Sequence, residues 1–173
     1  MIAVMTAVCV ATNYFLIGVA NVKLMDTIVF ITGLCFGSVV GASVGILTWM
    51  VYGTINPYGF SLPILIATSS SEAIYGILGG ALSKSQLFEL SEDNILLSNL
   101  KFGVIGFLST FTYDLLTNIA SAITSGIPIT VVLITGIPFA LIHQVSNSVL
   151  FFFAVTPVVK QIYKLDFEGL HVK

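Results

Sequence analysis

The feature that most limits how this chain can fold is a series of apolar runs, several of them about as long as a lipid bilayer is thick. Residues 2–20 contain few polar side chains, and as a helix that rises about 1.5 Å per residue they would measure roughly 28 Å. Over all 173 residues, 57% are hydrophobic and 8% are charged, against roughly 25% charged in an ordinary soluble domain. The sequence therefore predicts an all-α polytopic membrane protein and excludes a soluble domain.

These runs and the turn signals between them predict six transmembrane helices. The stretch 27–55 is too long for one span and too short for two full spans, so we predict two short helices that meet near Gly37, where glycines recur every four residues. Pro57 and Gly59 mark a turn, and Pro138 suits the first turn of the last helix. The predicted helices are 2–20, 27–36, 38–55, 62–82, 100–122 and 138–163, with a polar connection at 83–99, all within one membrane domain, 1–173.

The few charged residues bear on orientation and on partners. Six lysines, no arginine and eight acids give a formal net charge of −2, so nothing indicates a nucleic-acid surface. With six spans and a cytoplasmic N-terminus, Lys23 is the one lysine on the outside, which satisfies the positive-inside tendency. Both termini and 83–99 would then be cytoplasmic. A five-span arrangement with an outside N-terminus places every lysine inside and stays open as an alternative.

Two polar motifs lie inside the apolar runs. Asp114 and Asn118 are four residues apart, next to Tyr113, and His143 and Asn147 have the same spacing, which puts each pair on one helix face. A polar group without a partner in a membrane costs several kcal/mol by order of magnitude. We therefore predict ligand contacts, with Asp114 and Asn118 on one wall of an outward-facing pocket and His143 on the facing wall. Hydrogen bonding between helices is the alternative, and for Asn147 it is equally well supported.

Three further residues are candidates for ligand contact. Glu72 is an acid at mid-span of its predicted helix, where it either faces the same pocket or stabilises a break in the helix. Asn56 and Tyr58 lie in the turn at the outer interface, where aromatic side chains also serve as membrane anchors. One intramembrane histidine and scattered acids do not make a metal-ligand set, so we expect no metal and no cofactor.

Ala3, Ala7 and Ala11 fall at four-residue spacing in the first predicted helix and line small side chains along one ridge. This ridge resembles the alanine motif by which substrate-binding S-components of energy-coupling factor (ECF) transporters dock on their coupling subunit. Other parts of the chain that resemble members of this family are Asn21 to Leu24, the break at Phe36-Gly37, Asn56 to Gly59, Glu72 followed by 75–80, and the two polar motifs. The apolar piece between Pro128 and Pro138 departs from the family pattern.

The resemblance implies a six-helix bundle of the S-component type in the cell membrane, with both termini cytoplasmic. It would be no enzyme but a high-affinity binding subunit for a vitamin or related micronutrient, handing it to a transmembrane coupling subunit and two ATPase subunits. The charges of Asp114 and Glu72 suit a cationic, amine-bearing or hydroxyl-rich solute. Two other functions stay open: a small intramembrane enzyme that uses His143 with Asp114 or Glu72, and a scaffold subunit without a ligand.

Overall fold

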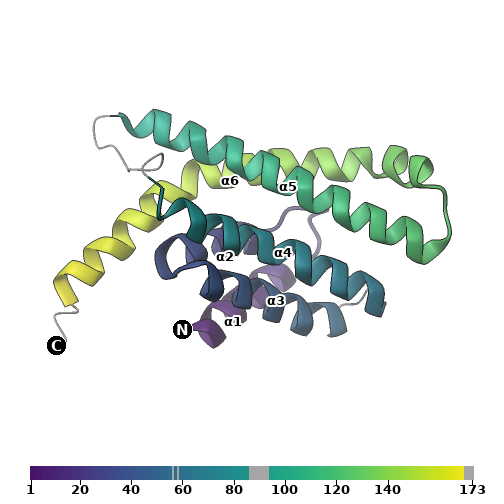
Figure 1. Cartoon of the computed structure of the whole chain (residues 1–173), viewed down its shortest axis with the longest axis horizontal. Helices are drawn as coiled ribbons and strands as arrows, with labels where there is room; N and C mark the ends of the chain where they lie inside the picture. Colours follow the sequence, from purple (N-terminus) through teal and green to yellow (C-terminus); the bar gives the residue numbers. More distant parts are fainter. Residues whose placement is uncertain (56, 58, 86–93, 170–173) are drawn as a thin grey trace.

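The structure is a computed structural model that describes residues 1–55, 57, 59–85 and 94–169, with the side chains of 165–169 left out. The described part is all-helical, without a strand, which confirms the predicted fold class. Figure 1 shows its six helices packed into one bundle. They are α1 (Ile2–Phe15), α2 (Met25–Phe36), α3 (Ser38–Ile55), α4 (Leu62–Leu82), α5 (Ile95–Ser125) and α6 (Ile129–Gly169).

Four of the described helices, α3 to α6, are long and apolar enough to cross a membrane. The other two, α1 and α2, are apolar but have only 14 and 12 residues. Many of the large apolar side chains on α5 and α6 are exposed, as expected of a surface that faces lipid. These features indicate a membrane protein, while the prediction of six spans stays a prediction.

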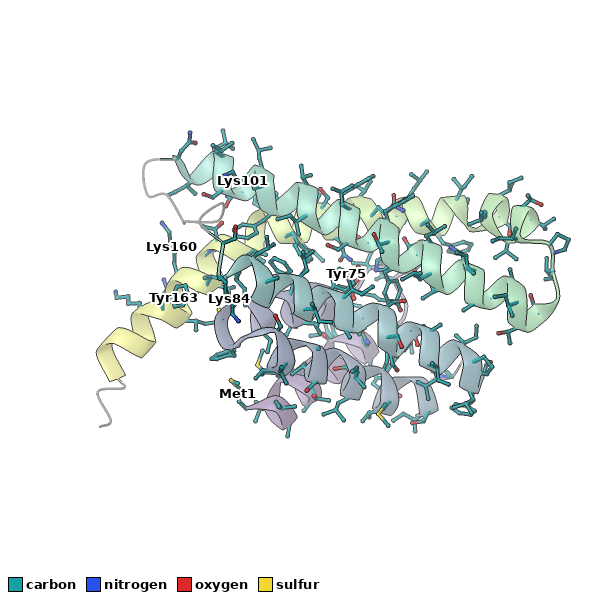
Figure 2. All side chains as sticks on the ribbon, viewed as in Figure 1. Met1, Tyr75, Lys84, Lys101, Lys160 and Tyr163 are labelled. Carbon is teal, nitrogen blue, oxygen red and sulfur yellow. The ribbon has the colours of Figure 1, made fainter. Side chains whose placement is uncertain are left out.

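The long helices α5 and α6 lie side by side as a hairpin, and the shorter helices pack against one flank of it (Figure 1). Within the shorter group, α3 packs along α4, and α2 contacts α3, α4 and α6. Figure 2 places Met1, Lys84, Lys101 and Lys160 toward one end of the long axis. The turn between α5 and α6 lies at the other end, which we call the far end.

Glycines allow α2, α3 and α4 to approach one another closely. A Cβ atom added at Gly76 of α4 would overlap the backbone of Gly41 and Ala42 in α3, and one added at Gly33 of α2 would overlap the backbone of Gly76. In lipid there is no hydrophobic driving force that brings helices together, so close van der Waals packing of this kind stabilises their association. The boundary between α2 and α3 falls at Gly37, where the sequence predicts a break, and its φ of 96° favours glycine.

Six helix ends differ from the predicted ones: the end of α1, the start of α2, and both ends of α5 and of α6. The first helix ends at Phe15 rather than at residue 20, and α5 begins at Ile95, where the side chain of Asn94 caps it by accepting from the Leu97 N–H at 3.2 Å. The prediction that the last helix starts at Pro138 is wrong, because α6 begins at Ile129 and continues through Pro138. A proline removes one backbone hydrogen bond, a loss that membrane helices tolerate, while an apolar loop in lipid would leave several groups unsatisfied.

Candidate functional site

Two adjoining cavities of about 660 and 340 Å³ open at the far end of the bundle, and we call them together the polar chamber. The larger lies under the connections before α2 and before α4, and the smaller extends between α5 and α6. Residues that line both cavities, and so join them, are Asn21, Lys23, Trp49, Ile64, Thr68 and Phe139. Their elements meet here because α1, α3 and α5 run toward the far end of the bundle, and α2, α4 and α6 run back from it.

Asp114 of α5 lies in the wall of the smaller cavity together with Asn118, one helical turn further along, and with Tyr113. Asp114 is 7% exposed, and its Oδ1 atom lies 2.8 Å from Nδ1 of His143. Its Oδ2 atom has no hydrogen-bond partner among the described residues. A buried carboxylate oxygen without a partner is costly, so Asp114 has an unfilled capacity to accept a hydrogen bond.

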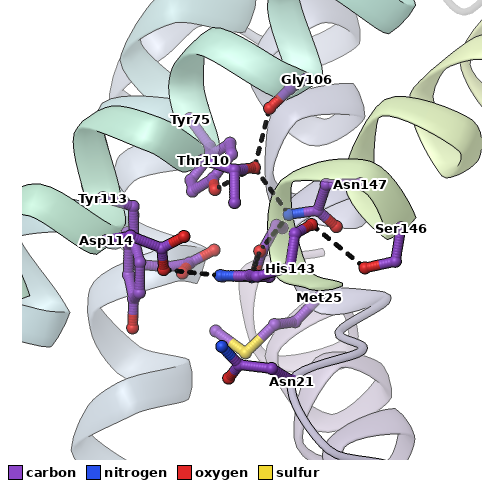
Figure 3. Close-up of polar contacts among 12 residues, drawn as sticks. Asn21, Met25, Tyr75, Gly106, Thr110, Tyr113, Asp114, His143, Ser146 and Asn147 are labelled. Carbon is purple, nitrogen blue, oxygen red and sulfur yellow. Dashed lines mark hydrogen bonds and ion pairs between the residues drawn. The ribbon is translucent and has the colours of Figure 1, made fainter. Parts of the chain in front are cut away.

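His143 does not stand on the facing wall of the chamber, so the predicted two-wall arrangement is wrong. Its ring lies between two acids. Nδ1 faces Asp114 (Figure 3), and Nε2 lies 2.7 Å from Oδ2 of Asp26 at the start of α2. The histidine is 1% exposed and lines neither cavity. The face of α6 that carries His143 packs toward α2. The four-residue spacing of His143 and Asn147 indicates that they share a face, but not which helix that face contacts.

The hydrogen bonds of the histidine limit how many protons the cluster of Asp26, His143 and Asp114 holds. Each short contact between a ring nitrogen and a carboxylate needs one proton. If both acids are ionised, both nitrogens are protonated and the ring is a cation; if the ring is neutral, one acid holds the second proton. In both descriptions the cluster carries one net negative charge inside an apolar bundle. Lys23 is the cation that lies at the chamber near it.

Asn147 extends this cluster into a network across four helices. Its amide donates to Oδ2 of Asp26 at 2.6 Å and lies 2.8 Å from the hydroxyl of Thr110, which also accepts from Tyr75 at 2.9 Å (Figure 3). Asn147 is fully buried and lines neither cavity, so the structure shows hydrogen bonding between helices for it. The network joins α2 and α4 to the α5–α6 hairpin and holds Asp114 in place through His143.

Lys23 and Asp26 are site residues that the sequence motifs did not indicate. The Lys23 ammonium lies 4.6 Å from the ring centre of Trp49 and 5.2 Å from that of Tyr113, so it rests on two aromatic faces inside the chamber. Asp26 is fully buried in the first turn of α2. The sequence signal was present: a lysine and an acid three residues apart, directly before an apolar run.

Glu72 is fully buried on α4 and lines neither cavity. Its Oε2 atom accepts a hydrogen bond from Nε1 of Trp49 at 3.2 Å, so it positions the ring on which Lys23 rests. Its role in ligand contact stays a prediction. Asn56 and Tyr58 lie outside the described residues, and the neighbouring Gly59 lines the larger cavity.

Ala3, Ala7 and Ala11 are exposed on α1. In the described part of the chain no group of three or more His, Cys, Asp or Glu side chains is arranged to hold a metal ion. Comparison with models of known protein families, with curated proteins and with solved structures gives no match.

Proposed function

We propose that this chain is the membrane-embedded binding subunit of an uptake system of the energy-coupling factor type, for a vitamin or related micronutrient. The observation that carries the proposal is the polar chamber, a small-molecule-sized cavity in an apolar bundle. Its wall contains Asp114, one of whose two carboxylate oxygens has no partner among the described residues. Polar groups in a membrane protein are costly and mark ligand or ion sites by default.

The construction of the chamber supports capture of a solute from one side of the membrane. Its cover is formed by two connections, which contribute Asn21 and Lys23 before α2 and Gly59 to Ser61 before α4. Connections are the parts of a fold that move most easily to admit a ligand. Because lysines gather at the opposite end (Figure 2), the positive-inside tendency favours a chamber that opens outward in the cell membrane, with both termini cytoplasmic.

The exposed alanine ridge of α1 supports docking on a coupling subunit, which would bring two ATPase subunits to the complex. Ala3, Ala7 and Ala11 leave room on the outside of the bundle for the close approach of a partner helix.

An enzymatic function has one observation in its favour, since Asp114 lies within hydrogen-bond reach of His143. However, both ring nitrogens of His143 already contact carboxylates, and the ring lines neither cavity. Glu72 hydrogen-bonds to Trp49 and not to the histidine. A general acid or base must reach its substrate, so we favour a binding role and assign no catalytic residue.

Native mass spectrometry of the purified protein tests the binding function. We expect one small molecule to co-purify, and we expect Asn118→Ala to reduce its retention because this residue lines the smaller cavity. Thr124→Ala, at an exposed α5 residue that lines neither cavity, is the matched control. A protein that carries no small molecule, and in which Asp114→Ala changes only expression, would be a scaffold subunit instead.

Docking is tested by Ala7→Trp, which places a large side chain on the ridge. We expect the variant to keep its bound solute and to lose co-purification with the coupling subunit. Val104→Trp, at an exposed position of α5 that is 56% accessible, is the control and should leave the complex intact. Survival of the complex in the Ala7 variant would refute docking through this ridge.

A further inference from the structure

The chamber presents one positive and one negative side chain to the same space. Lys23 reaches the smaller cavity from the connection before α2, and Asp114 reaches it from the middle of α5. The cavity of about 340 Å³ also contains the rings of Trp49, Tyr113 and Phe139. A ligand that fills it must therefore match two opposite charges with an apolar or aromatic surface between them.

Lys23 makes no ion pair with another described residue. The two ion pairs among the described residues both involve His143. Its ammonium lies on the faces of Trp49 and Tyr113, which stabilise a positive charge without neutralising it. An ammonium has three N–H donors and no acceptor. In a partly buried place this arrangement attracts an anionic group.

Asp114 has the complementary property. One of its oxygens is engaged by His143, and the other has no hydrogen-bond partner among the described residues. Because the histidine is held on its other side by Asp26, it keeps the Asp114 carboxylate in place. A ligand donor that settles beside Asp114 would supply the partner that the folded chain lacks.

We propose that the ligand is a small zwitterion, with a carboxylate that pairs with Lys23 and an ammonium that donates to Asp114. This inference rests on the proposed function and narrows its substrate class. The expectation drawn from the sequence counted Asp114 and Glu72 and was a cationic, amine-bearing or hydroxyl-rich solute. The zwitterion keeps the amine of that expectation and adds a carboxylate. Glu72 lies away from the cavities, whereas Lys23 lies in them.

Three probes with different charge spacing test this: 4-aminobutanoate, 6-aminohexanoate and 4-(aminomethyl)benzoate. Each is compared with the acid that lacks the amine and the amine that lacks the carboxylate. Trp49 is the single tryptophan of the chain and lines both cavities, so its fluorescence reports binding. Loss of one charge-assisted hydrogen bond costs about 1.5–3 kcal/mol, which corresponds to a roughly tenfold to hundredfold weaker affinity.

We expect at least one zwitterion to bind at least about tenfold more tightly than both of its singly charged analogues. Lys23→Met should reduce its affinity to that of the amine, and Asp114→Asn to that of the acid. Lys84→Met, an exposed lysine at the other end of the bundle, should have no effect. If Asp114→Asn does not fold, Lys23→Met decides the test, because Lys23 lies in a connection outside the helices.

The zwitterion proposal is overturned if no zwitterion binds more tightly than its analogues, or if Lys23→Met leaves the affinity unchanged. It is also overturned if the co-purified molecule lacks either charge, in which case the binding function stands. If no molecule co-purifies and no probe binds, both proposals fail.

Discussion

Asp26 offers the sharpest test of how the site is held together. Its Oδ2 atom makes two buried hydrogen bonds: it lies 2.7 Å from Nε2 of His143 and accepts from the Asn147 amide at 2.6 Å. Asp26→Leu replaces this carboxylate with an apolar side chain of similar shape and leaves both of its partners inside the bundle. The comparison variant is Thr110→Val, because the Thr110 hydroxyl also meets two buried partners, Asn147 and Tyr75, without carrying a charge.

The expected loss of stability follows from what each change leaves unpaired. Breaking a buried charge pair by removing one partner costs about 3–5 kcal/mol in soluble proteins. Hydrogen bonds between membrane helices average only about 0.6 kcal/mol, because the unfolded chain in the membrane also finds partners. We therefore expect Asp26→Leu to lower the free energy of unfolding by about 3 kcal/mol and Thr110→Val by about 1 kcal/mol.

Unfolding of the purified protein in mixed micelles with increasing SDS, followed by circular dichroism, measures both values. The double variant Asp26→Leu and His143→Leu completes a cycle, and its loss should be smaller than the sum of the single losses because the stranded donor is gone. If Asp26→Leu costs no more than Thr110→Val, or the cycle is additive, the charged cluster does not hold the helices together.

Two further predictions concern packing and helix ends. Gly76→Ala should destabilise the protein by at least about 2 kcal/mol in the same assay, because the added Cβ would overlap the α3 backbone. Gly103→Ala is the control and should cost far less, because the atom nearest to its added Cβ lies 3.3 Å away. Equal losses would contradict the close packing. Asn94→Ala should cost about 1 kcal/mol by removing the cap of α5 and should speed hydrogen exchange at Leu97; unchanged exchange would exclude the cap.

Much of the fold follows from local properties of the sequence. The apolar runs determine helices, since a backbone in lipid must satisfy its own hydrogen bonds. The break at Gly37 and the cap at Asn94 follow from residues whose own chemistry ends or begins a helix. The predicted start of the last helix at Pro138 was wrong because proline occurs both in the first turn of a helix and inside membrane helices. The surroundings of the residue decide between the two.

The candidate site was predictable only in part. Asp114 and Asn118 stood out as costly polar groups on one helix face, and the structure places both in one cavity wall. The contact partner of His143 was not predictable, because helical spacing tells which residues share a face and not which helix that face meets. Asp26 lies 117 positions from His143 in the chain, and their contact depends on how α2 packs against α6.

The sequence by itself determined that this chain is an apolar helical membrane protein with a few polar residues that need partners. The tertiary structure decided which partners they have: His143 is fixed between two acids, while Asp114 and Lys23 are left facing one chamber. The physical reason is that the cost of a polar group in lipid is a property of the residue, whereas its satisfaction depends on contacts between helices that are distant in the chain.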